Sequence, residues 1–433
     1  MTQINELAAR VKELENQLLV CTRCGMCQSV CPLFEQTGRE ADVARGKLAL
    51  LSGMISKIFS EPDGVNERLN RCLLCGSCAD NCPSGVNVIE IFIRARAILT
   101  DYKGLSLFKK MIFRQMLANP RIFNAITAWA SKFQDLLIKS NRDEQGTSCA
   151  RFVSPLIHDR HFMPMAKHPF HKTLEKMQVR STGSGVKVLL FTGCIIDKIM
   201  PHIAVASVKA LSHHNVGLTI PETQGCCGIP ALASGDMKTF NFLTAYHLDR
   251  FEKEEFDYLV TACATCTSTI KKLWPTLYSG HHPSVTESAR NLAAKTMDIN
   301  QFLTDVVKTA PQKETTDDGP VVTFHDPCHL KKSLGIVKQP RQLLTAAGYR
   351  LTEMEDADKC CGMGGSFNLL HYDISSSIGS LKQENIADTG CDTVASGCPA
   401  CMIQISDMLS RSSSRIKVRH PVDLYARSLE PGK

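Results

Sequence analysis

The chain has 433 residues, enough for two or three domains that each bury a core. Hydrophobic residues make up 43% and charged residues 21%, which excludes a disordered protein, and the formal charge of +7 is only a weak indication of nucleic-acid binding. Twenty cysteines in so long a chain exclude a small disulfide scaffold. The first residues are polar and no apolar run is long, so we expect neither a secretory signal nor a membrane span, but a cytoplasmic metal-binding protein.

The first 100 residues carry one cysteine pattern twice. Each copy reads C-x2-C-x2-C-x3-C-P, and each cysteine of the second copy lies 51 residues after its counterpart. This is the ligand spacing of bacterial ferredoxins, in which the fourth cysteine of one run ligates the cluster of the other run. Zinc is an unfavoured alternative, because a third cysteine at this short spacing is crowded around one tetrahedral ion. We therefore assign one cubane [4Fe-4S] cluster to Cys21, Cys24, Cys27 and Cys82, and a second to Cys72, Cys75, Cys78 and Cys31.

The segment between the two runs predicts a helical domain. Forty residues separate Cys31 from Cys72, more than a compact β-type ferredoxin leaves. Residues 40–59 place their apolar side chains on one side of a helix, which favours an all-helical di-cluster ferredoxin domain over residues 1–100. We expect the preceding N-terminal helix to pack against this domain, with docking to a partner as the alternative.

Residues 101–183 are expected to form a helical, basic bridge. Residues 103–142 contain eight Lys or Arg and a single acid, Asp135, with apolar side chains interleaved. The pattern is typical of a packed helix with a solvated basic face, and it also fits a helix on an anionic membrane surface or on a partner subunit. Peripheral contact with the inner face of a membrane therefore stays open. The turn-forming residues 181–185 end the bridge.

A longer cysteine pattern occurs twice in the rest of the chain. Each copy has one cysteine, then an adjacent Cys-Cys-Gly, then C-x2-C, and the copies are offset by 134 or 135 residues. A polar break at residues 312–319 separates them, so we expect domains at 184–311 and 320–433. The candidate metal ligands are Cys194, Cys226, Cys227, Cys263 and Cys266 in the first copy, and Cys328, Cys360, Cys361, Cys398 and Cys401 in the second.

Strand-like runs lead into these cysteines, with helical patterns between them. The runs are residues 186–191, 217–220 and 258–261 in the first copy, and 321–324, 349–352 and 393–395 in the second. This alternation predicts parallel sheets, whose strand C-termini share one edge, so the five cysteines of each copy should converge there. Five thiolates exceed what one zinc ion or one cubane cluster needs, which favours another type of iron–sulfur cluster.

Other residues of this half are less informative. His325 and His329 flank Cys328 and fit either packing or hydrogen bonding beside the metal site. Cys149 and Cys391 lie outside both patterns and are interpreted as packed thiols. No G-x-G-x-x-G follows a strand and no P-loop is present, so we do not expect the chain itself to bind flavin or NAD.

The pattern C-x31-C-C-x35-C-x2-C resembles the cysteine-rich CCG domain of heterodisulfide reductase subunits. The order of two ferredoxin motifs, a bridge and two such domains also resembles the iron–sulfur subunits of glycolate oxidase, of D-lactate dehydrogenases and of anaerobic glycerol-3-phosphate dehydrogenase. The resemblance implies an α + α/β protein with a helical di-cluster ferredoxin domain, a helical bridge and two duplicated α/β CCG domains. It also implies that one or two further clusters, of the noncubane [4Fe-4S] type, accompany the two cubanes.

The same resemblance implies an electron-transfer subunit of an oxidoreductase complex. A separate FAD-containing dehydrogenase subunit would oxidise D-lactate or glycolate, and this chain would pass the electrons to a quinone or a redox-protein acceptor. The alternative is a heterodisulfide-reductase-like catalytic subunit that reduces a disulfide at a noncubane cluster, because all five cysteines are present in both copies. No nucleic-acid partner and no catalytic side chain are expected.

Overall fold

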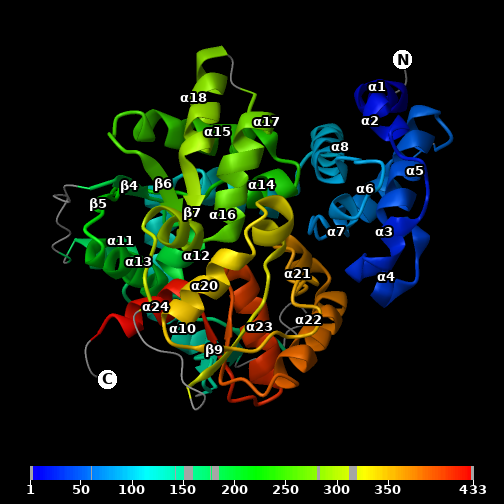
Figure 1. Cartoon of the computed structure of the whole chain (residues 1–433). Helices are drawn as coiled ribbons and strands as arrows, with labels where there is room; N and C mark the ends of the chain where they lie inside the picture. Colours follow the sequence, from blue (N-terminus) through cyan, green and yellow to red (C-terminus); the bar gives the residue numbers. More distant parts are fainter. Residues whose placement is uncertain are drawn as a thin grey trace.

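The computed structural model describes residues 3–59, 61–141, 143–150, 159–175, 177, 185–279, 283–311 and 319–430. An all-helical N-terminal domain lies beside a larger body of helices and parallel strands (Figure 1). The linkers expected at residues 181–185 and 312–319 lie almost entirely outside the described residues. In the described part of the chain, no helix combines the length and the apolar character that crossing a membrane requires.

The N-terminal domain packs its helices around one apolar core. The helix expected over residues 40–59 is α5, which is preceded by a 3-10 turn at Glu40–Asp42. Leu7, Val11 and Leu18 of the N-terminal segment are buried against α5 and α8, so this segment belongs to the core of the domain. The helices are α1 Gln3–Val11, α2 Glu15–Leu19, α3 Met26–Ser29, α4 Pro32–Thr37, α5 Ala44–Ile55, α6 Asp63–Asn70, α7 Ser77–Asp80 and α8 Val88–Lys103.

The bridge is helical only in part. A π-helical segment, Met111–Leu117, joins α9 to α10, and a small antiparallel sheet of three strands in the order β1-β2-β3 follows. No sequence pattern indicated these strands, because each has only two or three residues. The bridge elements are α9 Leu107–Lys110, α10 Pro120–Leu137, β1 Ile138–Ser140, β2 Ser148–Ala150, β3 His161–Phe162 and α11 Phe170–Leu174.

Two parallel four-stranded sheets form the rest, one in residues 185–311 (the first repeat) and one in residues 319–430 (the second repeat). Their strand orders are β5-β4-β6-β7 and β9-β8-β10-β11, so corresponding strands occupy corresponding places. All six expected runs form strands, and the edge strands β7 and β11 are additional. The strands are β4 Lys187–Leu190, β5 Gly217–Thr219, β6 Tyr258–Thr261, β7 Thr296–Asp298, β8 Val321–Phe324, β9 Arg350–Leu351, β10 Thr393–Ala395 and β11 Lys417–Arg419.

Helices cover the sheets, and the two repeats share one continuous apolar core. The last helix of the second repeat, α24, packs on α13 of the first repeat, where Tyr425 Oη lies 2.7 Å from His214 Nε2. The helices are α12 Gly193–Lys198, α13 Pro201–His213, α14 Ile229–Ala233, α15 Met237–Phe251, α16 Ala264–Ser268, α17 Trp274–Leu277, α18 Pro283–Lys295, α19 Ile299–Gln301, α20 Lys338–Ala346, α21 Ser366–Leu370, α22 Tyr372–Ala387, α23 Pro399–Arg411 and α24 Pro421–Ser428.

The N-terminal domain is held against both repeats. Arg96 of α8 is buried, and its guanidinium donates hydrogen bonds to the carbonyl oxygens of Cys72 and of Ala233 in the first repeat, both at 2.7 Å. Lys332 of the second repeat donates to Ser77 Oγ at 2.6 Å. In Figure 1 the blue N-terminal helices lie next to the orange helices α21 and α22 of the second repeat. These contacts fix where the cysteines of the three parts meet.

Candidate metal centres

Two small cavities in the N-terminal domain are lined by cysteines. Each has a volume of about 30 Å³. The loops that carry the cysteines turn at Gly25 and Gly76, whose positive φ angles of 87° and 78° favour glycine. The first cavity, site I, is lined by Cys21, Cys24, Cys27 and Cys82, with Cys78 at its border. The second, site II, is lined by Cys31, Cys72, Cys75 and Cys78.

The structure thus brings the fourth cysteine of each run to the triplet of the other run. Burial raises the pKa of the Cys31 thiol to about 11, and the nearby sulfurs of Cys72 and Cys75 also act to raise it. Buried sulfurs so close together repel one another once they ionise, and a bound cation removes this repulsion. Cys24 of site I is exposed, whereas the site II cysteines are at least half-buried.

All ten cysteines of the two repeats line a single cavity of about 180 Å³. The sequence led us to expect one rim of five cysteines in each repeat, and the structure shows in addition that the two rims face each other. Site III is the set Cys194, Cys226, Cys227, Cys263 and Cys266, and site IV is the set Cys328, Cys360, Cys361, Cys398 and Cys401. Apolar side chains such as Leu73, Ile229 and Met363 complete the lining.

Cys194, Cys263 and Cys398 lie shortly after the ends of parallel strands. Cys194 lies in α12, directly after β4, and Cys263 and Cys398 are the N-cap residues of α16 and α23. Gly362, which ends the second Cys-Cys-Gly, has a φ angle of 92°, and a Cβ atom there would lie 2.4 Å from the carbonyl oxygen of Ser375. Only glycine therefore allows this close turn beside the adjacent cysteines.

Neighbouring sulfurs in these sites are within hydrogen-bond contact. Hydrogen bonds from Cys226 and Cys266 lower the pKa of Cys227, and hydrogen bonds from Cys360 and Cys401 lower that of Cys361 in the same way. The bonds with Cys227 and Cys361, together with burial, raise the pKa of the donors Cys266 and Cys401. The pKa of Cys226 is raised first by its hydrogen bond with Cys194 and then by that with Cys227. Lys382, whose ammonium donates to the carbonyl oxygen of Asp356, is near enough to Cys360 and Cys361 to interact with them electrostatically, and burial lowers its pKa to about 8. Site IV therefore has a cationic group beside it.

The donor set fits iron–sulfur clusters. All twenty cysteines are free thiols, and eighteen of them line the three cavities. Soft thiolates select iron–sulfur clusters or zinc over Mg²⁺ or Ca²⁺. Cys149 lies half-buried in β2 and Cys391 is buried after α22, away from the cavities.

The sites adjoin one another in a definite order. Cys75 of site II is in hydrogen-bond contact with Cys360 of site IV. Cys398 of site IV is in the same kind of contact with Cys263 of site III. Thr265 links the last two sites, since its Oγ1 lies 3.3 Å from Cys398 Sγ and 3.1 Å from His329 Nδ1. Sequence reasoning missed Thr265, whose only signal is that the second C-x2-C has alanine, Ala400, at this place.

Comparisons with known proteins agree with this architecture. The cysteine-rich domain family called CCG matches residues 188–271 and 322–406, and the 4Fe-4S dicluster domain matches residues 17–86. The probable glycolate oxidase iron–sulfur subunit of Bacillus subtilis is 28% identical and aligns over 98% of this chain and 96% of its own length. A subunit of the fumarate reductase (CoM/CoB) of Methanothermobacter marburgensis is 27% identical over 93% of this chain and 71% of its own length. One subunit of the dihydromethanophenazine:CoB–CoM heterodisulfide reductase of Methanosarcina barkeri is 23% identical over 98% and 96%.

Proposed function

We propose a function on the premise that the chain belongs to the iron–sulfur proteins that combine a 4Fe-4S dicluster domain with two CCG domains. It is the electron-transfer subunit of an oxidoreductase complex. The observation that carries the proposal is the arrangement of eighteen cysteines in three adjoining cavities, with contacts that lead from site I to site III. Bound iron–sulfur clusters supply one-electron redox chemistry there.

Each site has a defined set of ligands in this proposal. Sites I and II each hold a cubane [4Fe-4S] cluster, with the fourth cysteine exchanged between the two runs. Sites III and IV each offer five cysteines to a further cluster, which we infer to be of the noncubane type. The chain's own contribution is to bury these groups, to bring their edges together and to place Arg96, Lys332 and Lys382 near the thiolates.

We infer that the electron donor is a separate FAD-containing subunit that oxidises D-lactate or glycolate. The similarity to the glycolate oxidase iron–sulfur subunit over nearly the whole length of both chains supports this donor. Site I is the entry point, because Cys24 is exposed to solvent where a partner can approach. The acceptor is a quinone or another redox protein.

A second candidate function is the reduction of a disulfide. It is favoured by the complete sets of five cysteines, which open on one shared cavity with apolar lining, and by the similarity to the heterodisulfide reductase subunit. In this case the chain itself would be the catalytic subunit. Adding a thiol to the oxidised protein would then change its EPR spectrum, whereas the spectrum of an electron-transfer subunit would not respond.

Iron analysis with reduction by the flavoprotein tests the main proposal. Anaerobically purified protein is expected to contain about 16 iron atoms and as many sulfides per chain if all four sites are filled, and about eight if only the cubanes are present. Mixing it with its flavoprotein partner and D-lactate or glycolate should bleach the cluster absorbance. Colourless protein that contains zinc, or iron-loaded protein that the reduced partner leaves oxidised, would refute the proposal.

The bridge suggests where the complex meets a membrane. The sequence favoured a packed helix with a solvated basic face for residues 103–142. In α10, however, a row of apolar side chains, spaced four and three residues apart in turn, is exposed. Trp129 is 65% and Leu136 is 68% exposed. The stripe consists of Ile122, Ile126, Trp129, Phe133 and Leu136, and the basic residues of the helices and their flanks are Lys103, Lys109, Lys110, Arg114, Arg121, Lys132 and Lys139. We infer that this surface binds an anionic lipid bilayer peripherally.

Vesicle sedimentation checks the lipid surface. The protein should bind vesicles that contain anionic lipid, and binding should weaken at high salt because the basic residues act electrostatically. Replacing Trp129 and Leu136 with Glu should weaken binding by more than about tenfold, since each side chain contributes roughly 1.5–3 kcal/mol when buried in lipid. The control Phe242→Glu changes another exposed apolar residue, on α15, and should bind normally. Equal loss in the control would contradict the assignment.

A further inference from the structure

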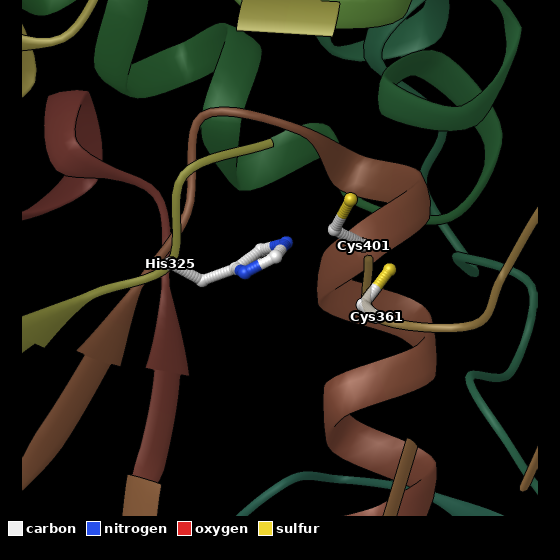
Figure 2. A group of neighbouring side chains, drawn as sticks. All are labelled: His325, Cys361 and Cys401. Carbon is white, nitrogen blue, oxygen red and sulfur yellow. The ribbon is translucent and has the colours of Figure 1, made fainter. Parts of the chain in front are cut away.

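His325 lies beside site IV, directly after strand β8. It is 1% exposed. One of its ring nitrogens and the Sγ atoms of Cys361 and Cys401 all lie within 4.8 Å of one another. Figure 2 shows the ring extending from the end of the strand, with its outer nitrogen facing the two sulfurs. This is the spacing of three atoms that can share one metal ion.

The hydrogen bonds of His325 determine which nitrogen carries the proton. Its Nδ1 atom lies 3.1 Å from the carbonyl oxygen of Ala357. A carbonyl oxygen can only accept, so Nδ1 is the donor, and the neutral ring keeps its lone pair on Nε2. Nε2 has no hydrogen-bond partner among the described residues, although it is buried. A histidine that binds a metal through one nitrogen usually donates its other N–H to a carbonyl or carboxylate, as His325 does.

A lone pair that faces two sulfurs needs a cation or a proton between them. Thiolates accept hydrogen bonds, so an unprotonated Nε2 and the Cys361 and Cys401 thiolates repel one another in this buried place. A metal ion bound to all three atoms removes both the repulsion and the unsatisfied acceptor. Imidazole nitrogen and thiolate sulfur are both ligands that iron accepts.

The corresponding place in site III offers no nitrogen. Phe191 ends strand β4 as His325 ends β8: its N–H donates to Val260 O at 2.8 Å, and that of His325 donates to Ala395 O at 2.9 Å. These acceptors are the corresponding residues of the neighbouring strands β6 and β10. Phe191 is fully buried and has no ligand atom.

His247, a histidine of the first repeat near Cys227, is already satisfied. His247 donates from Nδ1 to Leu243 O at 2.7 Å, and its Nε2 accepts the N–H of Gly225 at 3.1 Å. Neither nitrogen is left for a metal. The two repeats therefore differ in one feature. His325 has a ring nitrogen without a hydrogen-bond partner among the described residues, whereas Phe191 has no nitrogen in its side chain and both ring nitrogens of His247 are hydrogen-bonded.

We propose that Nε2 of His325 is a ligand of the iron group in site IV, together with Cys361 and Cys401, so that sites III and IV hold chemically different groups. The inference rests on the proposed function, because it requires iron in site IV.

Pulsed EPR on protein with ¹⁵N-labelled histidine tests the proposal. In the redox state in which site IV is paramagnetic, the full-length wild-type protein should show the hyperfine coupling of a directly bound histidine nitrogen. The coupling should disappear in His325→Phe, which reproduces the residue of site III. It should persist in His329→Asn, a control that removes a half-buried histidine lining the shared cavity.

The outcomes separate this inference from the proposed function. Iron-loaded wild-type protein without a histidine coupling, or with the same coupling in His325→Phe, would overturn the ligand role. If His325→Phe does not retain iron in site IV, the wild-type spectrum still decides, and His325→Cys should restore iron without the nitrogen coupling. Protein without iron would instead refute the proposed function.

Discussion

The double variant Cys72→Ala/Cys82→Ala is expected to lose about eight iron atoms per chain, whereas Cys21→Ala/Cys82→Ala loses only about four. The reason is the exchange of the fourth cysteine. Cys82 lines site I with Cys21, so removing both damages one cluster, but Cys72 belongs to site II. Iron and acid-labile sulfide per chain, with quantitative EPR of the remaining clusters, measure the difference.

A second pair of double variants tests the same exchange through Cys31, the fourth cysteine of the first run. Cys31→Ala/Cys72→Ala should lose about four iron atoms and Cys31→Ala/Cys21→Ala about eight. Cys149→Ala and Cys391→Ala serve as controls, because neither thiol lines a cavity, and both should keep the wild-type iron content. Circular dichroism checks that the helices remain. If the eight-iron losses occurred in the opposite pairs, each run would bind its own cluster and the assignment would be wrong.

The strands that carry the cysteines could be predicted because their sequence is unambiguous. Residues 186–191 are apolar except for Lys187 and residues 321–324 are apolar except for Thr323, as expected of largely buried parallel strands, and they contain β4 and β8. The edge strands β7 and β11 could not be predicted in the same way. Lys417–Arg419 has charged ends and three residues only, and it forms a strand because β10 is beside it. Tertiary pairing decides such short segments.

The ligand sets followed from spacing, but their spatial relations did not. Spacing within one run limits which thiols can reach one cluster, and the repeat offset relates the two copies. Neither says how the repeats dock. The shared cavity depends on contacts far apart in sequence, such as the hydrogen bond from Ala264 N–H to Gly397 O at 3.0 Å. The contact of Cys75 with Cys360 depends likewise on the docking of the N-terminal domain.

Side-chain roles were the least predictable level. The sequence favoured packing for His325, with hydrogen bonding beside the metal site as the alternative, and only the position of Ala357 O assigns the proton to Nδ1. The exposed stripe of α10 has the same periodicity as a buried stripe, so amphipathicity alone could not tell which face is covered. In both cases the deciding fact is a neighbour that the sequence pattern does not contain.

Removal of site IV should isolate site III from incoming electrons, whereas removal of site III should leave site IV reducible. Cys75 contacts Cys360 of site IV, and site IV contacts site III through Cys398 and Cys263. Electron transfer slows steeply with distance, so the loss of the intermediate group leaves a gap. In Cys361→Ala/Cys401→Ala we expect site III to be reduced at least about tenfold more slowly, equivalent to a barrier increase of about 1.4 kcal/mol.

The matched variant Cys227→Ala/Cys266→Ala removes the corresponding two cysteines of site III. Rapid freeze-quench EPR after mixing with the reduced flavoprotein partner should then show site IV reduced at the wild-type rate. Iron analysis of both variants establishes that only the intended site is empty. Because sites III and IV are built from the same strand positions, the absence of slowing in both variants would mean that electrons reach each site independently. Cys75 contacts site IV, and Cys398 of site IV contacts site III. These contacts predict that the loss of site IV slows the reduction of site III, but not the reverse.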